Sequence, residues 1–71
     1  MASRIALHAD ASYQDTDGYW VIAAEENTAG YIRVNAWPTL AEAQRYATDV
    51  NSRVGVTDED RRRILASSMT R

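Results

Sequence analysis

The side chains that could carry chemistry are few, and their types restrict what the chain could do. The sequence holds one histidine, His8, and neither cysteine nor lysine. Nucleophilic catalysis needs a nucleophile beside a base, yet His8 falls on the polar phase of a predicted strand and no Gly-x-Ser-x-Gly motif occurs. The same composition excludes thiolate sites and clusters of histidine around a metal. We therefore expect no enzyme activity, no cofactor and no metal.

Acidic residues gather in the first half of the chain. Residues 1–31 carry one arginine and five acids, whereas residues 32–71 carry seven arginines and five acids. The run Asp15-Thr16-Asp17-Gly18 matches part of a calcium loop. With Gly18 at the sixth loop position, Tyr13 and Ala24 occupy the first and last positions, where the loop needs Asp and Glu. We interpret these acids as solvated turns.

Three consecutive arginines, residues 61–63, form the sharpest charge feature. A guanidinium group suits phosphates, so this run could bind nucleic acid or an acidic protein patch. Consecutive helical side chains point about 100° apart, however, and three acids come directly before the run. The net charge of −2 is also not that of a basic nucleic-acid binder. Nucleic acid is therefore the less favoured partner.

Tryptophan and tyrosine supply all of the aromatic side chains, since the chain lacks phenylalanine. Both types are enriched in protein interfaces. We expect Trp20 in or near the core, and we expect Trp37 and the outer-face pair Tyr31 and Arg33 at an interface. The candidate partner-binding residues are therefore Tyr31, Arg33, Trp37, Arg61, Arg62 and Arg63.

Period-two patterns predict the elements that position these residues. Apolar residues alternate or gather in residues 5–9, 19–24 and 31–36, and short polar links separate these segments. In the third segment Ile32, Val34 and Ala36 share one face, while Tyr31, Arg33 and Asn35 share the other. The pattern predicts an antiparallel meander of three strands with one wet face.

The period changes to that of a helix after Pro38. Thr39 and Glu42 form a capping box, and Gly55 follows the apolar stripe at the position of a C-terminal cap. That stripe consists of Leu40, Ala43, Ala47, Val50 and Val54, which predicts a helix over residues 39–54. A second helix opens at Thr57, with acids in its first turn.

The fold class is therefore α+β, in the order β-β-β-α-α, with 71 residues in a single domain. We expect the first helix to cover one sheet face and the second to pack at an edge or reach outward. A core this small is often stabilised by a disulfide, a metal or another subunit. Disulfides and metals are excluded, so another protein chain is the remaining source of stability, which argues for a homodimer. No signal peptide or membrane span is predicted, and the cytoplasm is the expected location.

The second half also resembles a loose group of small proteins of phages, prophages and plasmids. The shared features are a Thr-capped, Ala-rich helix that ends in Asn51, a turn containing glycine, and a second helix that ends in Ala-Ser-Ser-Met. Here they cover residues 37–69, from Trp37-Pro38-Thr39 to Ala66-Ser67-Ser68-Met69. The resemblance implies an accessory protein of a mobile element and supplies no catalytic residues.

Two functional hypotheses follow. The first is a non-enzymatic protein-binding module that inhibits or modulates a host or phage complex, with anti-defence activity of the anti-CRISPR type as one form. The alternative is a small nucleic-acid-binding regulator that uses the arginines of the second helix. The second hypothesis predicts a steep dependence of binding on salt, because phosphate contacts release counterions.

Overall fold

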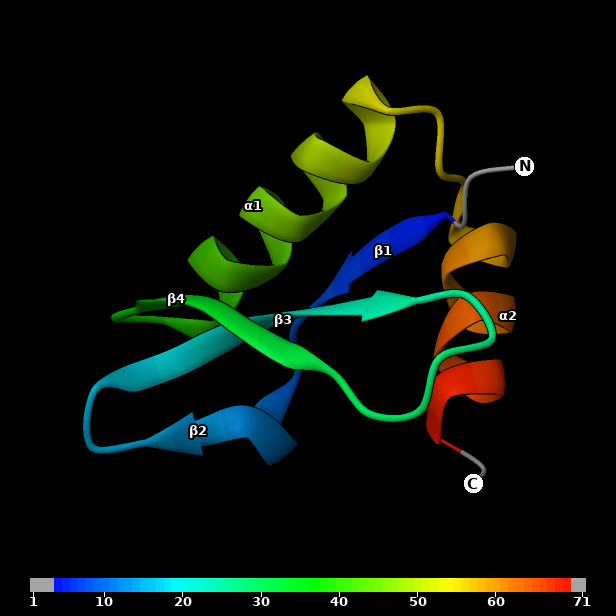
Figure 1. Cartoon of the computed structure of the whole chain (residues 1–71). Coiled ribbons are helices and arrows are strands. Elements are labelled where there is room, and N and C mark those ends of the chain that lie inside the picture. Colours follow the sequence, from blue (N-terminus) through cyan, green and yellow to red (C-terminus); the bar gives the residue numbers. More distant parts are fainter. Residues whose placement is uncertain (1–3, 70–71) are drawn as a thin grey trace.

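The computed structural model describes residues 4–69 and is α+β, as predicted, with one antiparallel sheet and two α-helices (Figure 1). The sheet has four strands rather than three. A short 3-10 helix, η1, follows the first strand. The elements are β1 Ile5–His8, η1 Ala11–Tyr13, β2 Gln14–Asp15, β3 Gly18–Glu25, β4 Ile32–Trp37, α1 Leu40–Arg53 and α2 Asp58–Met69.

The extra strand arises because the first strand is interrupted and then resumes. β3 is central: its residue Tyr19 pairs with Gln14 of β2 and Trp37 of β4, and Ala23 pairs with Leu7 of β1 and with Ile32. β1 and β2 therefore share one edge of β3, and β4 occupies the other edge. Asp10 caps η1 by accepting a hydrogen bond from the Ser12 N–H at 2.7 Å, which carries the chain away from the ladder before β2.

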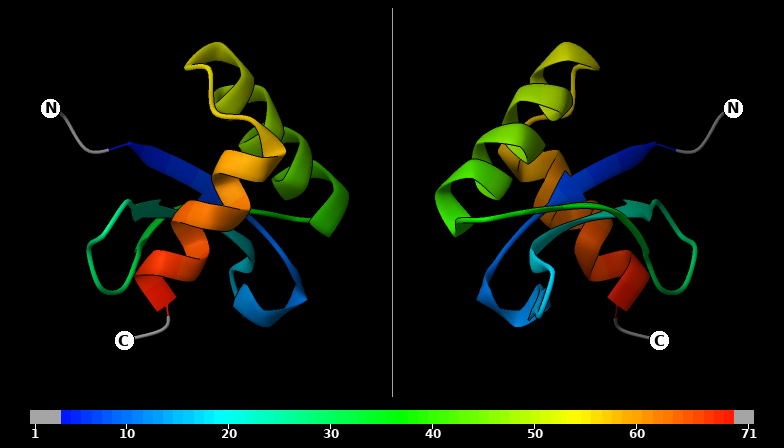
Figure 2. Two further views of the ribbon diagram at one scale, coloured as in Figure 1. Left: turned by 90° about the vertical axis from the view of Figure 1, so that its right-hand side faces the viewer. Right: turned by 90° about the vertical axis from the view of Figure 1, so that its left-hand side faces the viewer.

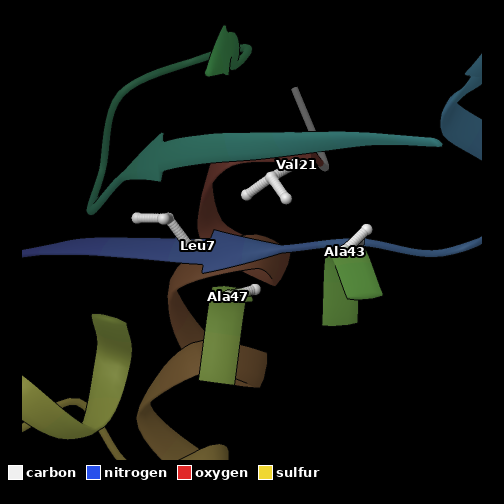
Figure 3. Packing of buried hydrophobic residues seen from close by; sticks show 5 residues of the cluster. Leu7, Val21, Ala43 and Ala47 are labelled. Carbon is white, nitrogen blue, oxygen red and sulfur yellow. The ribbon is translucent and has the colours of Figure 1, made fainter. Parts of the chain in front are cut away.

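α1 covers one face of the sheet. The capping box is confirmed, since the Thr39 side chain accepts a hydrogen bond from the Glu42 N–H at 3.2 Å. Successive residues of a strand point to opposite faces, so this face contains the odd-numbered positions of β1 and β3. Figure 3 shows four of its buried side chains gathered between the strands and the helix: Leu7, Val21, Ala43 and Ala47.

α2 packs on one end of the opposite face, over the edge strand β1 and the end of β3, so the expectation that it reaches outward is wrong. Its Ile64 is fully buried against Ala6 and Ala24, whose side chains lie on the even-numbered face. Val56, in the turn between the helices, completes this second cluster. The helix crosses the ends of β1 and β3 (Figures 1 and 2). No helix within residues 4–69 is long and apolar enough to cross a membrane.

β4 departs from the simple alternation predicted for residues 31–36. Val21 pairs with Asn35 but Ile22 pairs with Arg33, so Val34 is an extra residue in a bulge. Ile32 and Val34, which the pattern placed together on an apolar face, are 68% and 41% exposed. A bulge changes the phase of a strand and increases its twist, which a period-two pattern does not reveal.

Candidate functional site

A row of aromatic rings crosses the part of this sheet face that α2 leaves uncovered. The rings of His8 and Tyr13 meet edge to face with centroids 6.2 Å apart, and those of Tyr13 and Tyr31 meet in the same way at 5.2 Å. Ile22 pairs with both His8 and Arg33, so it lies on the same face. Ile22 is fully buried although it belongs to neither of the two core clusters that the helices cover. Burial beneath the row of aromatic rings would account for this.

Arg33 stacks on Trp20 beside this row. Its guanidinium carbon lies 5.2 Å from the Trp20 ring centroid, and its Nη1 lies 3.3 Å from Oδ2 of Asp15. Asp15 is held in turn by the Asp17 N–H at 2.8 Å. That N–H lowers the pKa of Asp15 most, followed by the Trp20 indole and Arg33. The indole N–H lies outside strict hydrogen-bond geometry but near enough to the carboxylate to act on it.

We call Tyr13, Trp20, Tyr31 and Arg33 the aromatic–arginine surface. Tyr31 and Arg33 remain exposed, whereas Tyr13 and Trp20 are half-buried beneath them. Burial raises the pKa of Tyr13, with Asp10 and Tyr31 adding to the effect, so its phenol keeps its proton at neutral pH. A planar cation fixed over an indole presents both a flat apolar side and N–H donors, which suits contact with a carboxylate or an aromatic ring.

The structure does not bring Trp37 to this surface. Trp37 pairs with Tyr19 on the α1 face, and its ring lies 5.4 Å from that of Tyr46 in α1. It is half-buried at the margin of the first core cluster. Its main contribution here is therefore to seat the beginning of α1, and Tyr31 and Arg33 lie on the other side of the sheet.

The arginines of residues 61–63 diverge into three different environments. Arg61 contacts the Nδ1 atom of His8 at 2.8 Å and lies 3.8 Å from Asp58. Arg63 pairs with Asp60 at 3.1 Å and with Glu26 at 2.7 Å, and these two acids raise its pKa. Within residues 4–69, Arg62 is the one of the three whose side chain has no hydrogen-bond or ion-pair partner. The triplet therefore forms no single basic patch.

His8 lies in a polar cleft between the two helices, but its ring nitrogens are both occupied. A guanidinium group can only donate, so Nδ1 accepts from Arg61 and Nε2 carries the proton that it donates to Asp10 at 2.9 Å. Burial opposes ionisation of Asp10, yet the Ser12 N–H and His8 together lower its pKa. The imidazole therefore has no free nitrogen to take a proton from a hydroxyl. The cleft is lined by residues that include Leu7, Asp10, Gln44, Thr48, Asp58 and Arg61.

The turn at Asp15-Thr16-Asp17-Gly18 joins β2 to β3 as a tight hairpin. No group of three or more His, Cys, Asp or Glu side chains within residues 4–69 could hold a metal ion. Comparisons with protein families, with curated proteins and with solved structures found no match.

Proposed function

We propose that the chain is a non-enzymatic protein-binding module that contacts its partner through the aromatic–arginine surface. The observation that carries this proposal is the position of Arg33. Its guanidinium group lies over the Trp20 ring and forms an ion pair with Asp15. Trp, Tyr and Arg are the residue types that most often dominate binding energy in protein interfaces. Because these side chains are already held in place, binding costs less conformational entropy than it would with free side chains.

The exposed ring of Tyr31 is a second feature of this surface that favours partner binding. Tyr31 is 45% exposed at the point where the chain enters β4, and its ring rests against Tyr13. Trp20 belongs to β3 and Arg33 to β4, so the strand register sets their positions, whereas Tyr13 ends η1 and Tyr31 directly precedes β4. A partner that offers an acidic side chain to Arg33 and an apolar or aromatic side chain to Tyr31 would match it.

The biological context in this proposal is that of a mobile-element accessory protein. The resemblance of residues 37–69 to small phage, prophage and plasmid proteins supports it, and such a protein would bind and inhibit a host complex, with an anti-defence target of the anti-CRISPR type included. We also propose a cytoplasmic location, because a chain without cysteine forms no disulfide and so needs no oxidising compartment. Nucleic acid is the competing partner, and Arg62 is the arginine of the triplet that remains open to it.

The test is affinity capture from lysate of the natural host, with and without nuclease, followed by binding measurements on the captured protein. We expect one stoichiometric protein that survives nuclease. Tyr31→Ala and Arg33→Ala should each weaken its binding by roughly 30-fold or more, as hot-spot truncations do. Arg33→Lys should lose much of this affinity too, because lysine keeps the charge but not the planar stack.

Arg45→Ala is the matched control, since Arg45 is an exposed arginine of α1 on the opposite face. It should bind like the wild-type protein, and circular dichroism should show that every variant is folded. Unchanged affinity in folded Tyr31→Ala and Arg33→Ala would remove the assignment of this surface. Capture of nucleic acid alone, with steep salt dependence that Arg62→Ala reduces, would favour the regulator instead.

A further inference from the structure

The fold closes one hydrogen-bonding edge of the sheet and leaves the other open. At the edge of β1, the Asn51 side chain accepts from the Leu7 N–H and donates to the Leu7 carbonyl, each at 2.9 Å. β2, on the same side of β3, has only two residues. β4 has six residues, and β3 is the one strand within residues 4–69 that pairs with it (Figure 1). In the described part of the chain, β4 is therefore the longest strand with an open edge.

The outer edge of β4 carries backbone groups that a further strand could bind. The N–H and C=O groups of a strand are directed to both of its sides, so part of those in β4 point away from β3. Apart from the ladder with β3, no backbone–backbone hydrogen bond within the described residues involves residues 32–37. α1 approaches β4 over its face, where Tyr46 contacts Trp37, and not along its edge. Such a row of unpaired groups is a template for strand pairing.

Two polar side-chain atoms of β4 also lack partners. Asn35 Oδ1 and Trp37 Nε1 are buried, and neither has a hydrogen-bond partner within residues 4–69. Both residues belong to the phase of β4 that faces α1, since they pair with Val21 and Tyr19. Buried polar atoms are normally hydrogen-bonded in folded proteins. A strand added at this edge would bring further polar groups to this side of β4.

The features that usually protect an edge strand are weak in β4. Natural edges often carry a charged side chain or a proline. The one charged side chain of β4, Arg33, is turned across β3 toward Trp20 and Asp15, so it does not guard the edge. The single proline of the chain follows the end of the strand. Ile32 and Val34 are 68% and 41% exposed, so the strand offers apolar neighbours to a strand beside it.

The bulge in β4 favours a strand of another protein over a second copy of this chain. Val34 is the extra residue, and it shifts the phase so that Arg33 lies on the side of Trp20 while Asn35 lies on the side of α1. If two β4 strands paired with each other, each copy would bring its own bulge, and one ladder would have to accommodate two irregularities. A regular segment meets only one. The bulge therefore acts against self-pairing at this edge.

We propose that the open edge of β4 binds an extended segment of the partner protein, which adds a strand to the sheet. Backbone hydrogen bonds to β4 supply affinity, and alternate side chains of the segment lie beside the two faces of the sheet. The exposed neighbours of the segment are Ile32 and Val34. The segment is therefore rich in β-branched and aromatic residues, and it has no proline at the amides that pair with β4.

This inference rests on the proposed function and specifies how the partner is held. Tyr31 directly precedes β4 and Arg33 belongs to it, so a segment along β4 lies next to the aromatic–arginine surface. Trp37 lies at the other end of the same strand, on the opposite face. The sequence predicts all three residues at an interface, and a partner that follows the edge of β4 can approach both faces.

The test begins with a displayed library of random linear peptides, selected against the wild-type chain. Enriched sequences should carry β-branched and aromatic residues at alternate positions. At saturating concentration, a selected peptide should slow amide exchange in residues 32–37 by roughly tenfold or more, because strand pairing protects edge amides. Exchange of the Leu7 amide should not change, since Asn51 already binds it.

Methylation of the backbone nitrogens of the selected peptide, one at a time, provides the matched control. A methyl group on an amide that faces β4 should weaken binding by roughly tenfold or more, because it removes a ladder hydrogen bond and obstructs the pairing. A methyl group on the alternate amides should have little effect. This period of two is expected of an added strand. Docking of side chains alone would not produce it.

Three results would overturn the proposal: no enrichment of linear peptides, equal tolerance of methylation at every position, or protection of residues 32–37 in the free chain that grows with its concentration. The last would identify a second copy as the occupant. None of them decides the proposed function, which is tested with the captured protein through Tyr31→Ala and Arg33→Ala. A selected peptide that tolerates every methylation but loses affinity in these two variants would support the aromatic–arginine surface and reject strand addition.

Discussion

The side-chain amide of Asn51 makes both of the hydrogen bonds that a further strand would make to Leu7. Its Oδ1 accepts from the Leu7 N–H and its Nδ2 donates to the Leu7 carbonyl, each at 2.9 Å. An edge strand that is left open tends to pair with other chains, and here α1 closes the edge of β1. The same contact fixes how far along the sheet the helix lies.

Replacing Asn51 by alanine should therefore destabilise the fold strongly. The change removes two buried hydrogen bonds and leaves the Leu7 backbone groups without partners, which together cost about 2–4 kcal/mol. A chain of this length has a total stability of about 4–10 kcal/mol. Urea denaturation followed by circular dichroism should show a much lower midpoint in Asn51→Ala.

Two further variants make this prediction specific. Asn51→Asp keeps the acceptor for the Leu7 N–H but turns an oxygen toward the Leu7 carbonyl, so it should be no more stable than Asn51→Ala. Gln44 donates to the Ala9 carbonyl at 3.3 Å from a more exposed position, so Gln44→Ala should cost under about 1 kcal/mol. Equal midpoints for Asn51→Ala and Gln44→Ala would contradict this account.

Local signals predicted the helices well, and the sheet less well. Thr39, Glu42 and Gly55 act over a few residues, so they mark the ends of α1 in the sequence itself. The interruption at η1 depends on how Asp10 caps one short turn, and the bulge depends on how Val34 is accommodated opposite β3. Both are decided by pairing with another strand. The position of Asn51 opposite the Leu7 backbone also depends on tertiary packing, so a local sequence pattern does not predict it.

The distinctive Ala-Ser-Ser-Met ending of α2 has a structural role. Ser68 is buried and its hydroxyl donates to the Glu25 carbonyl at 2.7 Å, while its carbonyl accepts from the Gly30 N–H at 3.0 Å. The Ser67 hydroxyl accepts from the Asn27 N–H at 3.1 Å. The two serines therefore tie the end of α2 to the link between β3 and β4.

Ser68→Ala should consequently lower stability by about 1–2 kcal/mol, because it removes a buried hydrogen bond and leaves the Glu25 carbonyl with one partner fewer. Amide exchange should also become faster in residues 26–31. Ser52→Ala, at an exposed position of α1, should change neither measurement. If Ser68→Ala matched Ser52→Ala in both, the ending would need an explanation other than packing.

Gly18 is the glycine at which an added side chain should be tolerated least. Its φ is +122°, and a Cβ there would lie 2.5 Å from the backbone carbonyl oxygen of Trp37. Gly55 also has a positive φ, +77°, but has open space around it. Gly18→Ala should cost at least about 2 kcal/mol, and Gly55→Ala about 1 kcal/mol. Thermal unfolding of the two variants compares them directly, and a smaller loss at Gly18 would show that β4 can move away from the turn.

Of the candidate site, the sequence identified Tyr31 and Arg33 but not the residues that hold them. The sequence predicts Trp20 in or near the core, because a period-two pattern assigns a side chain to a face without showing what lies opposite. Arg33 reaches Trp20 only through the register of β3 and β4, in which Ile22 pairs with Arg33. Once these two strands are paired, Arg33 and Trp20 fall on the same face of the sheet. That shared face is the signal that could have predicted the stack, and it requires knowing which strands pair.

Three aspartates link the stability of this fold to pH. The pKa values of Asp10, Asp15 and Asp60 all lie below the ordinary value of 3.8. Burial of Asp10 works against this shift, but the Ser12 N–H and His8 outweigh it. The Asp17 N–H is the largest cause at Asp15, and the Thr57 N–H is the largest cause at Asp60.

A lowered folded-state pKa means that the unfolded chain binds protons more readily, so stability rises with pH in this window. The contribution of these aspartates should be complete above about pH 5, and it should decline as the pH falls through 3.8 toward the lowered values. Urea midpoints between pH 2 and pH 6 should show this decline. Asp60→Asn, which loses the carboxylate that binds Arg4 and Arg63, should be less stable at pH 6 and less sensitive to acid. Parallel curves for Asp60→Asn and the wild-type chain would mean that these contacts do not favour the ionised carboxylate.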